Sequence, residues 1–329
     1  MKGFYYTLLF TLLGIQNSFS QEVNIIEQYG KISFRGLNIN KNIIWVSGNS
    51  GTIGRSLDGG VSWKWIQVKG FENNDFRDVQ AIDKNTAIIM CIASPAYILK
   101  TRDGGETWQK VYQNNDPAMF MDAMAFEDKK NGIVIGDPIN NKIFVAATQD
   151  GGESWTETDR LQFPNTMEGE AFFAASGTNL EFANGQYYLV SGGTVSRFFF
   201  DKKAKILPTL QGGKMTGANG IAIHGKHIII AGGDYEHQNR KDSALVYSTN
   251  GGATWQIPEE MTGGYRSGVC FASETIAVAC GITGVDISYN AGRTWKKISS
   301  EEFNSCAWSK KMNSVFFVGN NGRLGKLKL

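Results

Sequence analysis

The stretch Ser56-Leu57-Asp58-Gly59-Gly60-Val61-Ser62-Trp63 decides the fold, because it recurs along the chain. The later copies are residues 101–108 (TRDGGETW), 148–155 (TQDGGESW), 248–255 (STNGGATW) and 288–295 (SYNAGRTW). All five copies share Ser or Thr, any residue, Asp or Asn, Gly or Ala, Gly, two residues and Trp. Five copies in one register are a strong sign of an internal structural repeat.

Each position of the motif has a mechanical reason. The Asp or Asn side chain accepts hydrogen bonds from backbone N–H groups and closes a tight turn. The glycines allow the positive φ that such turns need, and the Trp supplies apolar surface that folds back over the hairpin. Because Asn replaces Asp in two copies, the turn needs an acceptor rather than a charge, so we predict structural roles only. The residues concerned are Asp58, Asp103, Asp150, Asn250, Asn290, Trp63, Trp108, Trp155, Trp255 and Trp295.

The spacing of the copies indicates the architecture. Asp58, Asp103 and Asp150 follow one another at 45 and 47 residues, and Asn250 and Asn290 are 40 residues apart. The interval of 100 residues from Asp150 to Asn250 corresponds to two periods, with a degenerate copy near residues 196–203. A period of this length, filled with short strands, is typical of β-propeller blades.

Seven repeats can be aligned by their first strands. These begin at residues 34–37, 76–79, 120–123, 168–171, 218–221, 265–268 and 303–306. The seventh repeat ends at Leu329 with three strands, and residues 21–29 can form the missing fourth strand. We therefore predict an all-β fold, namely a single seven-bladed propeller of four-stranded blades, closed by the N-terminal strand so that no edge is exposed.

The first 20 residues have the character of an export signal. Lys2 precedes an apolar run from Phe4 to Ile15, and small residues precede Gln21. We expect cleavage there and an exported periplasmic or secreted protein consisting of the propeller, residues 21–329, without stable membrane insertion. The net charge of +2 argues against a nucleic-acid partner.

The five repeats are Asp-box (BNR) motifs, and the chain resembles the sialidase-like superfamily in this respect. Its seven repeats and the D-G-G-x-[ST]-W variant are most similar to the photosystem II stability/assembly factor family and its exported bacterial relatives. The resemblance implies a non-catalytic binding or assembly scaffold. Plant and cyanobacterial members carry an arginine-rich patch on one face, and Arg35, Arg77 and Arg266 stand at matching places in three repeats.

The first-strand starts and the loops after the second strands predict a channel-mouth face that holds the unrepeated polar residues. A monomer that binds a protein or glycan there is the function we expect. Salt bridges between blades are the alternative interpretation of the same charges. For His237 in the long loop 232–243, a solvated side chain is the favoured interpretation. The candidate ligand-binding residues are Arg35, Arg77, Arg266, Asp78, Asp122, Glu170, Asp137, Asp234 and His237.

A glycoside hydrolase of the sialidase-like class is the second hypothesis. Its catalytic candidates are Glu170, Glu168, Asp78 and Tyr265, because two carboxylates or a Tyr–Glu pair with arginines can cleave a glycosidic bond. The three histidines lack the spacing of metal ligands, so no metal or cofactor is expected. The four cysteines lie in apolar strands and favour free thiols, with a Cys270–Cys280 or Cys270–Cys306 disulfide as the alternative.

Overall fold

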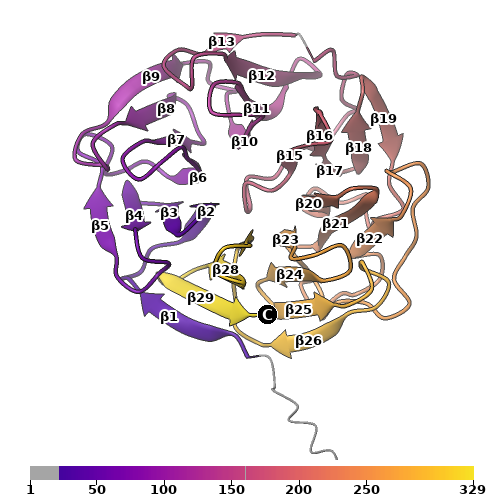
Figure 1. Cartoon of the computed structure of the whole chain (residues 1–329). Coiled ribbons are helices and arrows are strands. Elements are labelled where there is room, and N and C mark those ends of the chain that lie inside the picture. The colour runs from indigo at the N-terminus through magenta and orange to yellow at the C-terminus, as the bar shows by residue number, and fades with distance from the viewer. Residues whose placement is uncertain (1–21, 160) are drawn as a thin grey trace, which may run out of the picture.

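The computed structural model describes residues 22–159 and 161–329, and the predicted export signal lies outside them. Its strands form seven antiparallel sheets arranged as blades around a central channel (Figure 1). The predicted all-β seven-bladed propeller is thereby confirmed. Among the described residues, no helix is long and apolar enough to cross a membrane.

Blades one to three each run from the innermost to the outermost strand in chain order. Blade one consists of β2 (Phe34–Asn40), β3 (Ile43–Gly48), β4 (Thr52–Ser56) and β5 (Lys64–Gln67). Blade two consists of β6 (Phe76–Ala81), β7 (Ala87–Cys91), β8 (Ala96–Thr101) and β9 (Gln109–Asn114). Blade three consists of β10 (Met121–Phe126), β11 (Gly132–Ile139), β12 (Lys142–Thr148) and β13 (Thr156–Glu157).

Blades four to six follow the same order. Blade four consists of β15 (Leu180–Ala183), β16 (Gln186–Val190), β18 (Arg197–Phe200) and β19 (Lys203–Ile206). Blade five contains β20 (Thr216–His224), β21 (His227–Asp234) and β22 (Leu245–Ser248), and a single bridge from Tyr247 to Gln256 replaces its fourth strand. Blade six consists of β23 (Gly268–Phe271), β24 (Ala277–Gly281), β25 (Gly284–Ser288) and β26 (Lys296–Ser299).

The N-terminal strand closes the ring. β1 (Asn24–Gln28) pairs antiparallel with β29 (Arg323–Lys328), which continues through β28 (Ser314–Val318) to β27 (Ser305–Ser309). Blade seven therefore takes three strands from the C-terminal end of the chain and one from the N-terminal end, as the sequence predicts. Figure 1 shows the two ends side by side at this blade.

Apolar side chains fill the spaces between neighbouring blades. The seven clusters of buried residues each draw on two adjacent blades, for example Trp45 and Ile53 of blade one with Val79 and Ile89 of blade two. Because both faces of each sheet are covered, the second strands are nearly continuous apolar runs. All four cysteines are free thiols, as favoured above.

The Asp-box turns have the predicted hydrogen bonds. Asp58 accepts from Ser56 Oγ at 2.8 Å and from the backbone N–H of Ser62 at 2.9 Å, and Gly60, at φ 87°, donates its N–H to Ser56 Oγ. Asn250 forms the same bonds with Ser248 and Thr254. The degenerate copy in blade four is instead a two-residue hairpin turn in which Asp201 and Lys202 have φ of 44° and 59°.

The Asp-box tryptophans reach further than their own hairpins. Trp108 of blade two packs edge-on against Trp45 of blade one, with ring centroids 6.2 Å apart. Trp255 of blade five packs in the same way against Phe198 of blade four, at 5.1 Å. These tryptophans thus add to the packing between a blade and the preceding blade.

We predict that Asp150→Ala lowers the free energy of unfolding by about 1 kcal/mol, because the carboxylate accepts hydrogen bonds from Thr148, Glu153 and Ser154. Asp150→Asn keeps an acceptor and should change it by less than about 0.5 kcal/mol, since two natural copies carry Asn. Urea denaturation of the three proteins measures the difference. Equal losses in both variants would show that the charge, not the acceptor, holds the turn.

Candidate functional site

A β-bulge at the start of the first strand repeats in four blades. The register between the first and second strands skips one residue on the inner strand in blades one, two, three and five. A bulge leaves its extra residue unpaired and redirects the side chain. The four skipped residues are Arg35, Arg77, Asp122 and Asn219. Arg35, Arg77 and Asn219 line one end of the channel, whereas Asp122 is fully buried.

This register corrects the alignment of two blades. In blade three, Met121 rather than Phe120 stands where Phe76 stands in blade two, so Asp122 occupies the position of Arg77. In blade six, the backbone N–H of Arg266 bonds to Gly232 of the preceding blade, as the N–H of Phe34 bonds to Gly319. Arg266 therefore occupies the core position of Phe34 and not the channel position of Arg35.

The environment of Arg266 agrees with that placement. The side chain is fully buried and forms an ion pair with Asp286, which is also buried, with 2.7 Å between Arg266 Nε and the Asp286 carboxylate. Its remaining donors bond to Tyr265 and Thr283. All of these partners are internal, so the expectation that Arg266 lies at the channel mouth is not met.

Glu170 also lies elsewhere than the sequence predicts. It belongs to β14 (Glu170–Ala171), which pairs with β17 (Gly192–Gly193), whereas the first strand of blade four begins ten residues later at Leu180. The carboxylate is buried in an ion pair with Arg197 at 2.6 Å and accepts a hydrogen bond from Ser191 at 2.5 Å. Glu170 is therefore a structural anchor for the chain that follows it.

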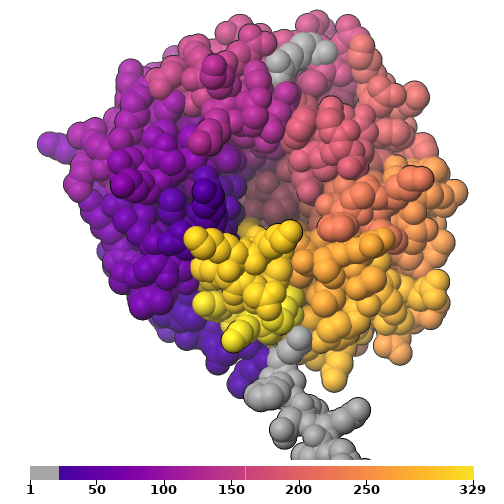
Figure 2. All heavy atoms as spheres, viewed as in Figure 1, coloured from indigo at the N-terminus to yellow at the C-terminus, as the bar shows by residue number. Residues whose placement is uncertain are grey.

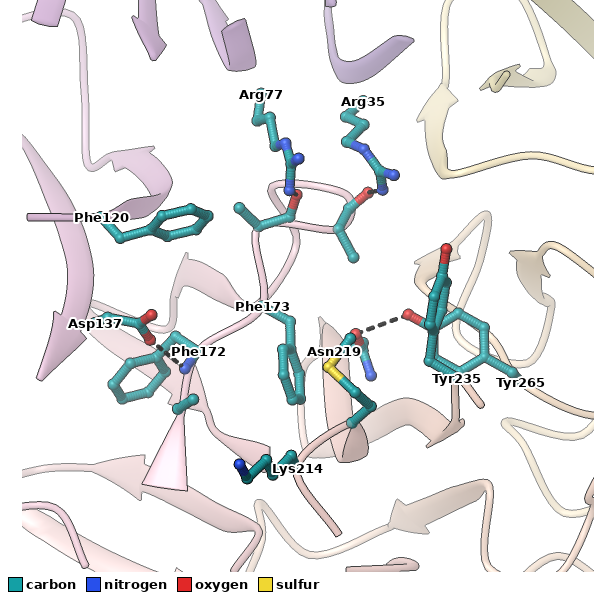
Figure 3. A pocket seen from close by; sticks show the side chains of 14 residues that line it. Arg35, Arg77, Phe120, Asp137, Phe172, Phe173, Lys214, Asn219, Tyr235 and Tyr265 are labelled. Carbon is teal, nitrogen blue, oxygen red and sulfur yellow. Dashed lines mark hydrogen bonds between the residues drawn. The ribbon is translucent and has the colours of Figure 1, made fainter. Parts of the chain in front are cut away.

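That chain enters the channel. Residues 172–178, called here the channel plug, lie inside the ring, and Figure 3 shows Phe172 and Phe173 of this segment among the side chains at one end of the channel. Arg35 donates to the carbonyl of Ala175 at 3.1 Å and Arg77 to that of Ala174 at 3.4 Å. The plug is also bonded to blades five, six and seven, through Ile221 to Thr178, Ser176 to Ser267, and Ser305 to Ser176.

The plug divides the channel into two cavities. The upper cavity, of about 440 Å³, lies on the Arg35 side (Figure 3). Figure 2, seen from the opposite face, shows the centre of the ring hollowed. The lower cavity, of about 430 Å³, lies on the other side and is lined by the other ends of the first strands. Phe172 to Ala175 line the upper cavity, whereas Ser176 to Thr178 line the lower one.

The upper cavity combines basic and aromatic side chains. Its basic residues are Arg35, Arg77 and Lys214, and its only acidic one in the described chain is Asp137. Aromatic rings form part of its walls, and one of them, Tyr265, donates its hydroxyl to Asn219 at 2.9 Å (Figure 3). The aromatic lining residues are Phe120, Phe172, Phe173, Tyr235 and Tyr265.

The positive charges of Arg35 and Arg77 are only partly compensated by neighbouring carboxylates. Arg77 pairs with Asp75 at 2.8 Å, but Arg35 has no ion-pair partner within the described residues. Burial and the charge of Arg77 both lower the pKa of Arg35, which the more distant Asp75 only partly offsets. The pair therefore carries excess positive charge and spare donors, which suits a carboxylate or another planar anion.

Asp122 and Asp137 do not supply that missing charge. Burial and the neighbouring Asp137 raise the pKa of Asp122 well above its usual value, while Arg77 and the backbone of Ala174 lower it only in part. Neither oxygen of Asp122 has a hydrogen-bond partner of good geometry in the described chain. Burial likewise raises the pKa of Asp137, which accepts the N–H of Phe172 at 2.9 Å. Both carboxyls are thereby biased toward the neutral form.

Asp234 and His237 do not line the upper cavity. The Asp234 carboxylate caps its own loop by accepting the N–H groups of Glu236 and His237 at 2.9 and 3.0 Å. The His237 side chain is 76% exposed and contacts Asp234 at 2.9 Å. This arrangement favours the interpretation of His237 as a solvated side chain, and only Tyr235 from this loop reaches the upper cavity.

The residues of the hydrolase hypothesis do not meet at one place. Glu168 is exposed, Glu170 is bound to Arg197, and Tyr265 is buried against Asn219. Asp78 lines the lower cavity, on the far side of the plug from Tyr265. Within the described residues, no three His, Cys, Asp or Glu side chains are grouped in a way that could hold a metal ion.

Residues 17–119, about a third of the chain, match the family model of the photosynthesis system II assembly factor YCF48. No curated protein matches the chain. This stretch of the Asp-box propeller is therefore similar in sequence to that assembly factor.

Three solved structures share the fold at low sequence identity. YCF48 from Cyanidioschyzon merolae is 16% identical with a TM-score of 0.66, covering 93% of this chain and 99% of its own. A structure of YCF48 bound to D1 peptide is 16% identical with a TM-score of 0.64, covering 95% and 96%. The Pan2 WD40 domain of Neurospora crassa is 11% identical with a TM-score of 0.61, covering 94% and 95%.

The enclosed carboxyl of Asp78 generates a prediction about pH. Burial raises its pKa to about 8, although Met124 and Val79 donate backbone hydrogen bonds to it. The folded protein thus holds a proton that the unfolded chain releases near pH 4, so the stabilising contribution is lost as pH rises toward 8. Relative to Asp78→Asn, the free energy of unfolding of the natural protein should fall by about 1.4 kcal/mol per pH unit between pH 5 and 7.5.

Urea denaturation of both proteins across this range measures the slope. Asp116→Asn, at an exposed position of a turn, serves as the control and should run parallel to the natural protein. A constant difference between Asp78→Asn and the natural protein at all pH values would show that Asp78 is ionised in the folded state.

Proposed function

We propose that this Asp-box propeller, related to the photosystem II assembly factor, is an exported binding scaffold that holds a segment of a partner protein at the upper cavity. The observation that carries the proposal is the pair Arg35 and Arg77, which faces an open cavity lined in part by aromatic rings. Only one carboxylate, that of Asp75, forms an ion pair with these two guanidinium groups in the described chain. A peptide segment with an acidic side chain or a free terminal carboxylate supplies the missing anion. The arginines bind it through parallel N–H donors.

The plug supports the choice of a polypeptide as the ligand. Arg35 and Arg77 already hold the carbonyls of Ala175 and Ala174, so the site accepts main-chain oxygen in the present structure. The remaining donors and the rings of Phe120, Phe173 and Tyr235 are left for a second chain lying over the plug. The likeness in fold to YCF48, which has been solved bound to D1 peptide, is consistent with this mode of binding.

The scaffold role requires no chemistry at the site. The acids nearest the arginines are biased toward the neutral form or paired, and Glu170 is held by Arg197. A glycan is the other ligand class that fits an exported propeller with an aromatic cavity, and the binding experiment below separates it from a protein partner.

We expect the double change Arg35→Glu and Arg77→Glu to weaken partner binding by at least about tenfold, because it places two anions where the ligand's anion binds. Residues 21–329 are immobilised, exposed to the exported protein fraction, and bound proteins are identified after cross-linking. Lys296→Glu, a charge reversal on the outermost strand of blade six, is the matched control and should bind normally.

Equal capture by the double variant and the natural protein would overturn the assignment of the upper cavity. Binding to a glycan array that the double variant loses would assign a glycan as the ligand instead of a protein. Turnover of any bound glycan would contradict the scaffold role itself.

Export has its own test. Fractionation of cells that produce the full chain should place the protein outside the cytoplasm, with an intact mass that begins at Gln21. The change Leu8→Arg interrupts the apolar run of the signal and should leave the uncleaved chain in the cytoplasm. An intact mass that retains Met1 in the exported fraction would contradict cleavage.

A further inference from the structure

The lower cavity has the opposite chemistry to the upper one. All seven first strands contribute to its wall, and the plug forms its floor through Ser176, Gly177 and Thr178. No lysine or arginine lines it within the described residues, whereas the carboxyls of Asp78 and Glu181 do. One channel thus ends in a basic cavity on one face and an acidic cavity on the other.

The two carboxyls have no cationic partner. Asp78 is 6% exposed and lies against the plug, where an added Cβ on Gly177 would come within 2.8 Å of its carboxyl carbon. Within the part of the chain that the structure describes, it accepts hydrogen bonds only from the backbone N–H groups of Val79 and Met124. Glu181 is half-buried and lines the same cavity. Neither forms an ion pair in the described chain, although enclosed acids are normally paired.

Aromatic rings surround the same space. Phe126 and Phe182 come from blades three and four, and Phe271 and Trp308 from blades six and seven. The faces of such rings attract cations, most strongly where water is excluded. The side-chain amides of Asn38 and Gln80 add neutral acceptors. A positively charged group with an aliphatic stem satisfies the acids and the rings together.

We propose that the lower cavity is a second binding site, which takes an alkylammonium group with Asp78 and Glu181 as its counter-charges and the aromatic rings around its stem. The group belongs to a free aliphatic amine or to the side chain of a lysine on another protein, which share this chemistry. The inference depends on the lower cavity alone, and the proposed function at the upper cavity can fail or hold without affecting it.

Binding should be coupled to the release of protons. Burial raises the pKa of Glu181, as it does that of Asp78, to about 8, so both carboxyls are mostly neutral at pH 7 in the empty cavity. An ammonium ion favours the ionised form, whereas its own pKa near 10.4 keeps it charged. Affinity should therefore rise about tenfold between pH 7 and 9 for each carboxyl that it engages.

Few other groups titrate around these carboxyls. His224 lies at the rim, next to Phe271, and the thiols of Cys270 and Cys306 line blades six and seven. Arg77 directly precedes Asp78 on β6, and its charge interacts with Asp122 of β10. The variants Asp78→Asn and Glu181→Gln therefore assign the pH dependence to the carboxyls.

Isothermal titration calorimetry of residues 21–329 with n-pentylamine, at pH 7, 8 and 9 in buffers of different ionisation enthalpy, measures affinity and proton release together. The neutral isostere n-pentanol tests whether the charge matters. Nα-acetyl-lysine N-methylamide tests the lysine side chain as the source of the ammonium group. We expect saturable binding of the amine, at least tenfold tighter at pH 9 than at pH 7, with n-pentanol at least tenfold weaker at pH 9.

The variants Asp78→Asn and Glu181→Gln keep the volume of each side chain and remove its charge. Each should weaken amine binding at pH 9 by about tenfold or more and reduce the number of protons released. Glu259→Gln, an exposed residue outside the cavity, is the control and should bind as the natural protein does. Thermal unfolding of each variant shows whether it is folded.

Three results would overturn the proposal. They are equal affinity for n-pentanol and n-pentylamine, amine binding that does not change from pH 7 to 9, and the absence of binding at millimolar amine with folded protein. Tighter binding of the lysine derivative than of n-pentylamine would assign the site to a partner protein's lysine, and the reverse order would assign it to a free amine.

Discussion

The structure depends on the burial of both faces of every sheet against a neighbouring sheet. A single four-stranded blade has two apolar faces and cannot be stable alone in water. The ring satisfies all fourteen faces with seven interfaces, one for each apolar cluster. The last interface joins blade one to blade seven, and β1 completes blade seven and adds Ile26 to that interface. Closure of the ring therefore contributes to the stability of every blade. The Asp-box tryptophans add to the same interfaces from the outer turns.

Closure leaves a channel whose walls are the first strands, and the chain fills it with its own backbone. A peptide segment without regular structure needs partners for its carbonyl and N–H groups when it is buried. Arg35 and Arg77 supply two of them, and backbone and hydroxyl groups of blades five to seven supply others. The same bonds keep two guanidinium groups close together, where an ion pair with Asp75 compensates only one charge. The plug and the basic cavity above it are therefore parts of one arrangement.

The sequence could predict the blades but not the side-chain register within all of them. The Asp-box period, the apolar second strands and the incomplete seventh repeat were sufficient for the propeller and its closure by β1. Arg35, Arg77 and Asp137 are where the alignment predicts, at the upper cavity. Arg266 lies one residue away from the predicted channel position. A bulge position and a core position differ by a single step along the strand, and the sequence Tyr265-Arg266-Ser267 fits both.

The plug left a weaker signal in the sequence. The interval from Asp150 to Asn250 is longer than two of the 45-residue periods seen earlier in the chain, and the extra residues precede the true first strand of blade four at Leu180. Glu168 to Ala171 resemble a strand start locally, and no periodicity marks residues 172–178, because their bonds run to six other blades rather than to neighbours in sequence. Long-range partners of this kind are visible only after the ring is assembled.

One strand shows how closely the two ends of the channel are related. In β6 the bulged residue Arg77 lines the upper cavity and the next residue, Asp78, lines the lower one, with the plug between them. The bulge is what permits adjacent residues to serve opposite ends, since regular alternation would send one of them into the blade interface. Opposite charges one residue apart would neutralise each other if both reached the same water-filled space. Because the plug separates them, the basic end keeps its charge, and the acidic end is left as enclosed carboxyls without a partner.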